Sequence, residues 1–356
     1  MQSISFTGVI LAGGDSSRMG RDKAQITHRG KPLWRSSYDA LASTCNDLLI
    51  AGRRPDLAAA KVPCFTDRLA GSALAGIETG LVHCKSEWIT VLPCDLPYPS
   101  VSLLNRLQAA CSTDVDAVVP RTRTGREPLV ACYRKSALKP ITCRLESGNP
   151  KILDLLDELN VCYLGEEDLP DGWRRAFTNI NTPADLEQLL APPPAISFFA
   201  NSGTGKTTLI ENLIRELMKN GWTVGALKHD AHNFEIDHEG KDSWRLARAG
   251  AAVTAISSST KTAVISQHQS EQSLDEILLS FAGKVDIVLT EGFRQSRLHK
   301  IEIHRTELNR PLISQLQNVP GLVAVASDSP VDTEVPVFDL NEITELSTFI
   351  EKNFLK

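Results

Sequence analysis

A short apolar run that ends in a glycine-containing loop occurs twice in this chain, and this recurrence constrains the fold more than any other feature. The first copy is SFTGVILAGGDSSRMGRDKA, which starts at Ser5, and the second is AISFFANSGTGKTTLIENLI, which starts at Ala195. In each copy a buried strand would lead into a loop whose glycines let backbone N–H groups approach a phosphate. Two such loops predict two nucleotide-binding α/β units in one chain.

Three consecutive prolines mark the expected boundary between these units. An amphipathic helix that ends at Leu190 cannot continue through Pro192–Pro194, because proline lacks the backbone N–H and fixes φ. A length of 356 residues also suits two domains. We expect domains at residues 1–190 and 195–356, joined by a proline-rich linker at 191–194.

Both halves alternate short branched apolar runs with helical stretches, which predicts parallel-rich sheets with ligand sites at the carboxyl ends of strands. The predicted strands of the first half are GVILA, DLLIAG, WITVLPCD and DAVVP, with helices near 31–44 and 72–83. Those of the second half are AISFFA, WTVGALKH, AAVTAI, DIVLTEGF, KIEIHR and LVAVAS. A helix after AISFFA would place Leu209, Leu213 and Leu217 on one face and use Gly221 as its C-cap.

Composition narrows the class of protein. Residues 1–190 carry 22 basic and 22 acidic side chains and residues 191–356 carry 16 and 21, whereas a nucleic-acid-binding domain usually has a basic excess. No apolar run approaches the ~20 residues that cross a bilayer, and the N-terminus lacks a basic leader region. We expect a cytoplasmic protein without nucleic-acid or membrane partners.

The eight cysteines are ten or more residues apart, which favours buried free thiols.

The first loop carries the residue types that phosphate chemistry needs. Gly13 and Gly14 follow a predicted strand, and Arg18, Arg21 and Lys23 add positive charge. Lys23 and Arg18 could offset the charge of a leaving pyrophosphate. By itself, a loop with two glycines is also compatible with an ordinary turn before a polar helix.

Two carboxylates are predicted near this loop. Asp95 ends the run WITVLPC at the same sheet edge, where a carboxylate suits Mg²⁺ on phosphate oxygens. Asp67 follows VPCFT, another predicted strand. The simpler alternatives are a solvated turn at Asp95 and a helix cap at Asp67. The simpler alternative has more weight for Asp67 than for Asp95.

The second loop, ANSGTGKTT, lies between a predicted strand and a helix, as a P-loop requires. Gly203 and Gly205 would form the backbone nest, Lys206 would reach the outer phosphates, and Thr207 would bind Mg²⁺, with Thr208 also at the nucleotide. Glu291 ends the run DIVLTE and is a candidate metal-binding acid near this loop; a solvated strand end is the alternative. The pattern departs from G-x-x-x-x-G-K-[ST] at its first position, Ala200.

A histidine-rich stretch follows the next predicted strand. It contains His229, Asp230, His232, Asp237 and His238. Their spacing matches no standard zinc pattern, so a solvated phosphate-sensing loop is favoured over a dedicated transition-metal site.

Residues 5–190 resemble the molybdenum cofactor nucleotidyltransferases. LAGGDSSRMGRDKA is similar to the family signature LAGGxSxRMGxDK, and CFTDRLAGSALAGI, VLPCDLPY and NINTPADL resemble its later motifs in order. The resemblance implies a Rossmann-like nucleotidyltransferase fold, with Asp95 holding the metal. It also implies the nucleotide-binding residues, which are Leu11, Ala12, Gly13, Gly14, Lys23, Asp67 and Asp95.

Details of the first-half motifs indicate which nucleotide is bound and which contacts to it differ from the family. Gly13 matches the LAGG of the guanylyl-transferring branch, whereas the cytidylyl branch more often has LAAG. Two positions depart from the family pattern: Gly52 stands where the A-N-R segment has a nucleotide-contacting asparagine, and Ala73 replaces the proline of G-P-L-A-G.

Residues 195–356 resemble the P-loop GTP-binding adaptor of molybdopterin-guanine dinucleotide biosynthesis. The resemblance rests on the P-loop, KHDAHNFEIDHEGKDSWR, TEGF and KIEIHR. It implies a P-loop NTPase-like domain that binds GTP. Because exposed sheet edges in small P-loop domains often pair, a homodimer through this domain is a further expectation.

Together the two resemblances imply a fused enzyme. It would transfer GMP from GTP to molybdenum-molybdopterin with Mg²⁺ as cofactor, releasing pyrophosphate, and its further partners would be a molybdenum insertion protein and pterin-dependent apoenzymes. Three alternatives stay open at this point: a cytidylyltransferase of the same cofactor, a sugar-1-phosphate nucleotidyltransferase fused to a kinase-like domain, and a GTP-binding cofactor carrier without transferase activity.

Overall fold

The computed structural model describes residues 4–13, 22–28, 30–52, 54, 62–69, 71–229, 237–268 and 270–355. Five residues singled out above therefore lie outside the described residues: Gly14, Arg18, Arg21, Asp230 and His232. The chain forms two compact units, one of residues 1–190 with 217–223 and the other of 191–216 with 224–356. No helix in the described ranges has the length and apolar character to cross a membrane.

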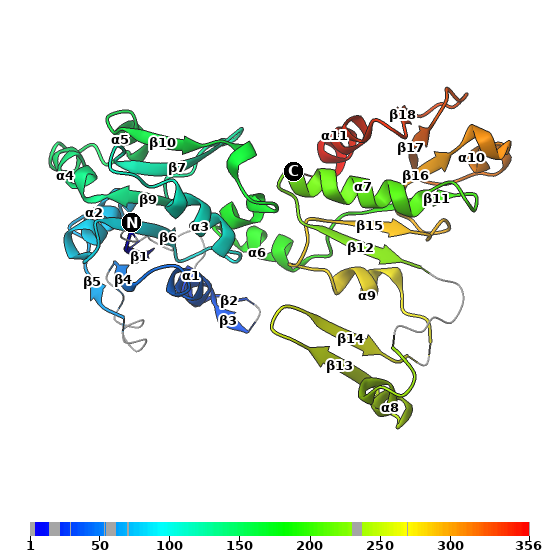
Figure 1. The fold of residues 1–356 in the computed structure, drawn as a ribbon, viewed down its shortest axis with the longest axis horizontal. Helices are drawn as coiled ribbons and strands as arrows, with labels where there is room; N and C mark the ends of the chain where they lie inside the picture. Colours follow the sequence, from blue (N-terminus) through cyan, green and yellow to red (C-terminus); the bar gives the residue numbers. More distant parts are fainter. Residues whose placement is uncertain are drawn as a thin grey trace. The chain divides into compact units, whose positions relative to one another are not determined.

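The first unit is built on a mixed sheet (Figure 1). Its strands are β1 (Phe6–Leu11), β4 (Asp47–Ala51), β5 (Cys64–Phe65), β6 (Trp88–Pro93), β7 (Ala117–Thr122), β8 (Gly125–Arg126), β9 (Ala131–Arg134) and β10 (Val161–Leu164), with β2 (Thr27–His28) and β3 (Lys31–Pro32) in a separate ribbon. The order is β10-β7-β9-β6-β1-β4-β5, and β8 pairs with β7. Only β8 and β9 run antiparallel to their neighbours in this sheet, so β1, β4, β6, β7 and β10 present their carboxyl ends at one edge.

Helices cover both faces of this sheet. They are α1 (Leu33–Ala42), α2 (Ala73–His83), α3 (Val101–Ala109), α4 (Leu138–Glu146), α5 (Ile152–Leu156) and α6 (Pro183–Leu190). Along β1, Ile10 joins a buried cluster with α1 and α3, while Val9 joins another with α2 and α4. Because both faces are covered, the strand is apolar throughout, which is why GVILA reads as a continuous run. The predicted strands and the helices near 31–44 and 72–83 are confirmed.

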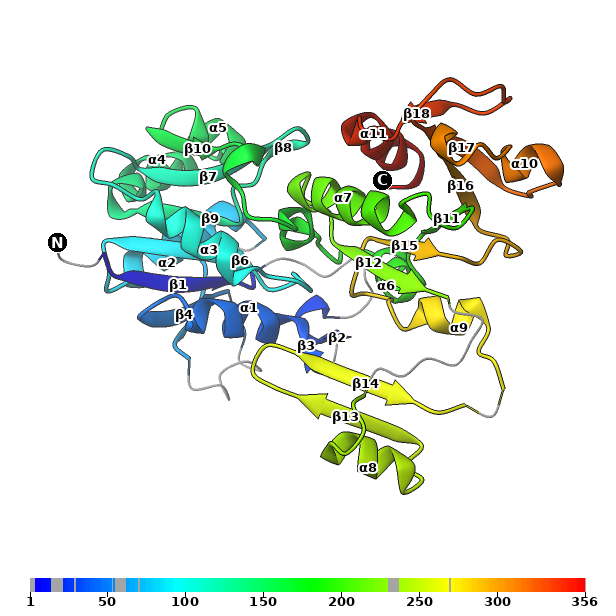
Figure 2. The same ribbon diagram turned by 45° about the vertical axis from the view of Figure 1, so that its right-hand side comes forward.

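The second unit contains a fully parallel sheet of the order β12-β15-β11-β16-β17-β18. These strands are β11 (Ala195–Ala200), β12 (Val224–Lys228), β15 (Ile287–Glu291), β16 (His299–His304), β17 (Leu322–Ser327) and β18 (Val337–Asp339). In both views, α7 (Lys206–Lys219) and α9 (Leu274–Leu279) lie on opposite sides of this sheet (Figures 1 and 2). The remaining helices are α8 (Asp242–Arg248), α10 (Ile313–Leu316) and α11 (Ile343–Phe354).

One predicted strand of the second unit lies outside the parallel sheet. AAVTAI forms β13 (Val253–Ser257), but this strand pairs antiparallel with β14 (Thr262–Ser266) in a ribbon of two strands. In β13 only Thr254 is buried. The predicted strand is confirmed, and an apolar run of this length does not specify which strand it pairs with.

Helix α7 has the predicted leucine face and the predicted C-cap at Gly221. Leu209, Leu213 and Leu217 are buried. Gly221 has φ +90° and donates its N–H to the carbonyl of Met218, while Trp222 donates to Leu217. This pair of bonds is a Schellman C-cap, which needs a left-handed residue and so favours glycine at position 221.

The cysteines are only partly as expected. All eight are free thiols, but only Cys84, Cys111 and Cys132 are buried, and Cys143 is exposed. The prediction of buried thiols is therefore wrong for Cys143, which lies on α4 where one face meets solvent.

Candidate functional site

Among the described residues predicted to bind phosphate in the first unit, Gly13, Lys23 and Asp95 lie at the carboxyl edge of the central strands. Leu11 is directly opposite Pro93 where β1 pairs with β6, and Cys94 donates its N–H to the carbonyl of Leu11 at 3.1 Å. Gly13 and Asp95 each lie two residues beyond this pair. The sequence thus brings the glycine loop and the Asp95 carboxylate to neighbouring strand ends.

Lys23 joins this edge from the short helix η1 (Lys23–Gln25). Its Nζ donates to Asn181 Oδ1 at 2.7 Å and lies 3.8 Å from Asp95 Oδ2. The Asp22 side chain caps η1 by accepting from the N–H of Ala24 at 3.1 Å. Arg54 in turn donates to both Asp22 oxygens, at 3.2 and 2.7 Å, so a bidentate pair fixes the start of η1 and therefore Lys23.

Asn181 is a site residue that was not singled out from the sequence, although the motif NINTPADL contains it. Asp185 accepts the N–H groups of Asn181 and Thr182 at 2.7 and 2.8 Å, and Ile180 donates to the carbonyl of Asp95 at 3.3 Å. Desolvation opposes ionisation of Asp185, but these bonds outweigh it and lower its pKa. The start of α6 is thereby held against Asp95.

The two carboxylates of this edge suit a hard metal ion. The side chain of Asp95 is 17% exposed, and burial raises its pKa while the Lys23 charge opposes the rise. Burial also raises the pKa of Asp67, whose Oδ1 is buried without a hydrogen-bond partner in the described part of the chain. Carboxylate oxygens are the ligands that Mg²⁺ prefers, and both side chains lie at carboxyl ends of strands in the same sheet, Asp95 after β6 and Asp67 after β5. The residues present therefore fit this ion.

The glycine loop is closely packed at two positions, against a side chain at Gly13 and against backbone at Gly52. A Cβ on Gly13 would lie 2.3 Å from Asp67 Oδ2. A Cβ on Gly52, where φ is +126°, would lie 2.6 Å from the backbone nitrogen of Gly13. Asp67 therefore lies against the glycine loop, and the N-cap of the helix that follows is Ser72 and not Asp67.

Replacing Gly13 by alanine should displace the Asp67 carboxylate, because the two cannot occupy the same space. We expect GMP transfer to fall about 100-fold, the scale of losing one preorganised electrostatic group, together with a lower melting temperature. A Gly13→Ala/Asp67→Ala double variant is the control. If the clash is the cause, the double variant regains the melting temperature without regaining activity; simple addition of the two losses in stability would contradict it.

The second unit places its phosphate loop between β11 and α7. Gly203 and Gly205 have φ of +85° and +81°, the conformation that forms a backbone nest. Thr207 Oγ1 donates to Glu291 Oε2 at 3.1 Å, so the structure brings together the two predicted metal ligands, while Thr208 follows in the first turn of α7. Arg305, which was not predicted, donates to the carbonyl of Thr204 at 2.9 Å and braces the loop from the end of β16.

The histidine-rich stretch is only partly described. His229 donates its N–H to the carbonyl of Glu291, and its ring packs on Phe293 with centroids 4.5 Å apart. Phe293 has φ +55°, a strained conformation for an aromatic residue, two residues after Glu291. Across the described ranges, no group of three or more histidine, cysteine, aspartate or glutamate side chains is arranged to hold a metal.

Comparison with known proteins finds a different family in each half of the chain. Residues 8–160 match the profile of the "MobA-like NTP transferase domain", and residues 195–328 match "Molybdopterin guanine dinucleotide synthesis protein B". A molybdenum cofactor guanylyltransferase from Vibrio campbellii is 34% identical over 192 residues, which is 53% of this chain and 96% of the relative. A molybdopterin-guanine dinucleotide biosynthesis adapter protein from Haemophilus influenzae is 36% identical over 159 residues, which is 44% of this chain and 88% of the relative.

This chain belongs to both families. Its first half is a member of the molybdenum cofactor guanylyltransferases and its second half a member of the adapter proteins. Among solved structures, molybdopterin-guanine dinucleotide biosynthesis protein A from Archaeoglobus fulgidus is 27% identical, covering 51% of this chain and 95% of that one, with a TM-score of 0.43.

The structure explains why this member departs from the guanylyltransferase and adapter patterns at three positions. At Gly52 any side chain would meet the backbone of Ala12 and Gly13, so an asparagine does not fit this loop. Ala73 is the first residue of α2, a position that proline favours but alanine tolerates, and the Ser72 side chain caps the helix. Ala200 ends β11, and its φ is not positive, so glycine is not needed there.

Proposed function

We propose that the chain transfers GMP from GTP to molybdenum-molybdopterin, forming molybdopterin-guanine dinucleotide and pyrophosphate. The observation that carries this proposal is that Lys23 contacts both Asp95 and Asn181 at the sheet edge that Gly13 follows. This edge belongs to the half of the chain that is related to guanylyltransferases. Among the alternatives, the cytidylyltransferase is disfavoured by Gly13 and by the names of the relatives.

The residues of this edge can position an in-line displacement. A terminal phosphate oxygen of the acceptor forms a bond to the α-phosphorus of GTP, and the bond to the β-phosphate oxygen breaks. Lys23 lies where it can offset charge on the leaving pyrophosphate, and we propose the same role for Arg18. The acceptor phosphate is already ionised near neutral pH, so no strong general base is required. Mg²⁺ held by Asp95 would supply charge neutralisation at the phosphate oxygens.

For the second unit we propose GTP binding that assists this transfer. Gly203, Gly205 and Lys206 would surround the phosphates, and Thr207 with Glu291 would hold Mg²⁺. A short proline-rich linker keeps one unit at a millimolar effective concentration around the other. Dimerisation through this unit, delivery to apoenzymes, contact with a molybdenum insertion protein and a cytoplasmic location remain predictions.

Nucleotide transfer by the purified chain tests the proposal. Molybdenum-molybdopterin and Mg²⁺ are incubated with α-labelled GTP or CTP in parallel reactions. We expect label to move from GTP to the pterin, with pyrophosphate released in equal amount. Preference for CTP would overturn the choice of nucleotide, and binding of GTP without transfer from either nucleotide would make the chain a carrier.

A further inference from the structure

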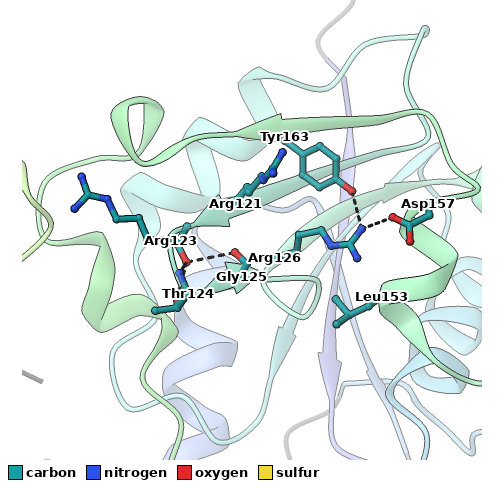
Figure 3. A pocket seen from close by; sticks show the side chains of 9 residues that line it. Arg121, Arg123, Thr124, Gly125, Arg126, Leu153, Asp157 and Tyr163 are labelled. Carbon is teal, nitrogen blue, oxygen red and sulfur yellow. Dashed lines mark hydrogen bonds and ion pairs between the residues drawn. The ribbon is translucent and has the colours of Figure 1, made fainter.

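A pocket of about 640 Å³ lies in the first unit, outside the residues discussed so far (Figure 3). It is formed by the β7–β8 hairpin, α5 and β10, and its lining includes Arg121, Arg126, Asp157, Tyr163 and the apolar Leu153. Its size suits one small ligand. Among the described residues, neither Gly13 nor Asp95 lines it.

The register of the sheet places this pocket beside the reaction site. Cys132 on β9 pairs with Thr90 on β6 on one side and with Val118 on β7 on the other. Because β6 and β7 both run antiparallel to β9, they run in the same direction, and their carboxyl ends at Pro93 and Thr122 lie at the same edge of the sheet. With β9 between them, these strands are two strand spacings apart, about 10 Å. Asp95 follows β6, and the hairpin that lines the pocket follows β7. A molecule whose reacting phosphate is at Asp95 could therefore extend into the pocket.

The polar groups of the pocket form one connected set. Arg126 donates to Asp157 Oδ1 at 2.5 Å and to the Tyr163 hydroxyl at 3.4 Å, and Figure 3 shows its guanidinium between these two side chains. The Arg121 guanidinium lies 5.9 Å from the centre of the Tyr163 ring. The pocket thus offers two guanidinium groups as donors, a carboxylate as acceptor, and an aromatic ring with Leu153 as flat apolar surface.

We propose that this pocket binds the 2-amino-4-oxopteridine ring of the acceptor, an inference that rests on the function proposed above. A carboxylate accepts from the adjacent ring N–H and amino group of such a heterocycle, and guanidinium groups donate to its carbonyl and ring nitrogens. Planar rings also stack on tyrosine and on guanidinium planes.

Guanine presents the same hydrogen-bonding edge, so the position of the pocket decides between the two substrates. The residues expected to hold GTP, including Gly13 and Asp67, follow β1 and β5, on one side of β6. The pocket is on the other side of β6, at β7 and β10. The donor and the acceptor would then approach Asp95 from opposite directions along the sheet edge, as an in-line displacement requires.

The test replaces Arg126 by glutamine in the full chain. Losing a charge-assisted hydrogen bond to the pterin should raise KM for molybdenum-molybdopterin about 10- to 100-fold and leave KM for GTP unchanged. Arg134→Gln is the matched control: Arg134 also pairs with a carboxylate, Glu87 at 2.9 Å, and its side chain is 25% exposed against 26% for Arg126. Arg134 ends β9 at the opposite edge of the sheet, so its loss should change neither KM. Arg121→Gln, at an exposed residue, repeats the test should Arg126→Gln unfold.

Three results would overturn the inference. The first is an increase in KM for GTP with the acceptor KM unchanged, which would assign the pocket to guanine. The second is no change in either KM in both folded variants. The third is an equal increase in the acceptor KM in Arg134→Gln. Quenching of the fluorescence of neopterin phosphate measures pterin binding without any transfer. If the wild-type chain binds this probe and Arg126→Gln does not, the pocket assignment stands even where transfer fails. If the wild type transfers GMP and the variants keep their acceptor KM, only the pocket assignment fails.

Discussion

Replacing Asp95 by asparagine is expected to lower kcat for GMP transfer about 1,000-fold, the loss associated with removing one preorganised electrostatic group from a reaction centre. Asparagine keeps the shape of the side chain but removes the negative charge that would hold Mg²⁺. Binding of GTP should persist, because the glycine loop and Lys23 are unchanged. Transfer is measured with α-labelled GTP, and binding by calorimetry.

The stability of this variant separates a catalytic effect from unfolding. Because burial raises the pKa of Asp95 above its value in the unfolded chain, the ionised carboxylate costs folding free energy at neutral pH. Asp95→Asn should therefore keep or raise the melting temperature. Asp39→Asn is the control, because it makes the same chemical change at a surface residue that pairs with Lys31 and Arg35. Transfer at more than a tenth of the wild-type rate in Asp95→Asn would exclude Asp95 as the metal-holding group.

Replacing Lys206 by alanine is expected to weaken GTP binding by the second unit about 100-fold. A lysine at the start of α7 would donate to phosphate oxygens, and a hydrogen bond to a charged group contributes about 1.5–3 kcal/mol. Calorimetry should then detect one GTP per chain in the variant at concentrations where the wild type binds two. GMP transfer by the first unit should continue, with any assistance from the second unit lost.

The control for this experiment is Lys352→Ala, an exposed lysine on α11 of the same unit. It should keep two binding sites per chain. A single site in the wild type, or two undiminished sites in Lys206→Ala, would show that the glycine loop after β11 is not a nucleotide site.

Much of the fold could be predicted because its strands are buried on both faces. β1 and β6 are buried at every position, so each appears as a mainly apolar run without charged residues, followed closely by a glycine or an aspartate. The two-residue strands β2, β3 and β8 carry no such pattern, whereas β5 lies within the predicted strand VPCFT. The antiparallel direction of β9 was likewise not predictable, since periodicity reports burial and not the direction of a strand.

The candidate site was predictable where a single motif supplies the residue and its strand, as for Gly13 and Asp95. It was not predictable where chemistry depends on segments far apart in the sequence. Lys23 meets Asn181 across 158 positions, and Arg126 meets Tyr163 across 37. The segment RTRTGRE, which supplies the arginines of the pocket, has the composition of an ordinary polar turn.

The close packing of Gly13, Gly52 and Asp67 also has an evolutionary consequence. A side chain at position 52 would require the β1 loop to move, and any movement of that loop changes the space available to the carboxylate at position 67. The three positions are therefore not free to change one at a time. Across related chains they should covary, with a larger residue at 52 accompanied by a rearranged loop at 13 and by a compensating choice at 67.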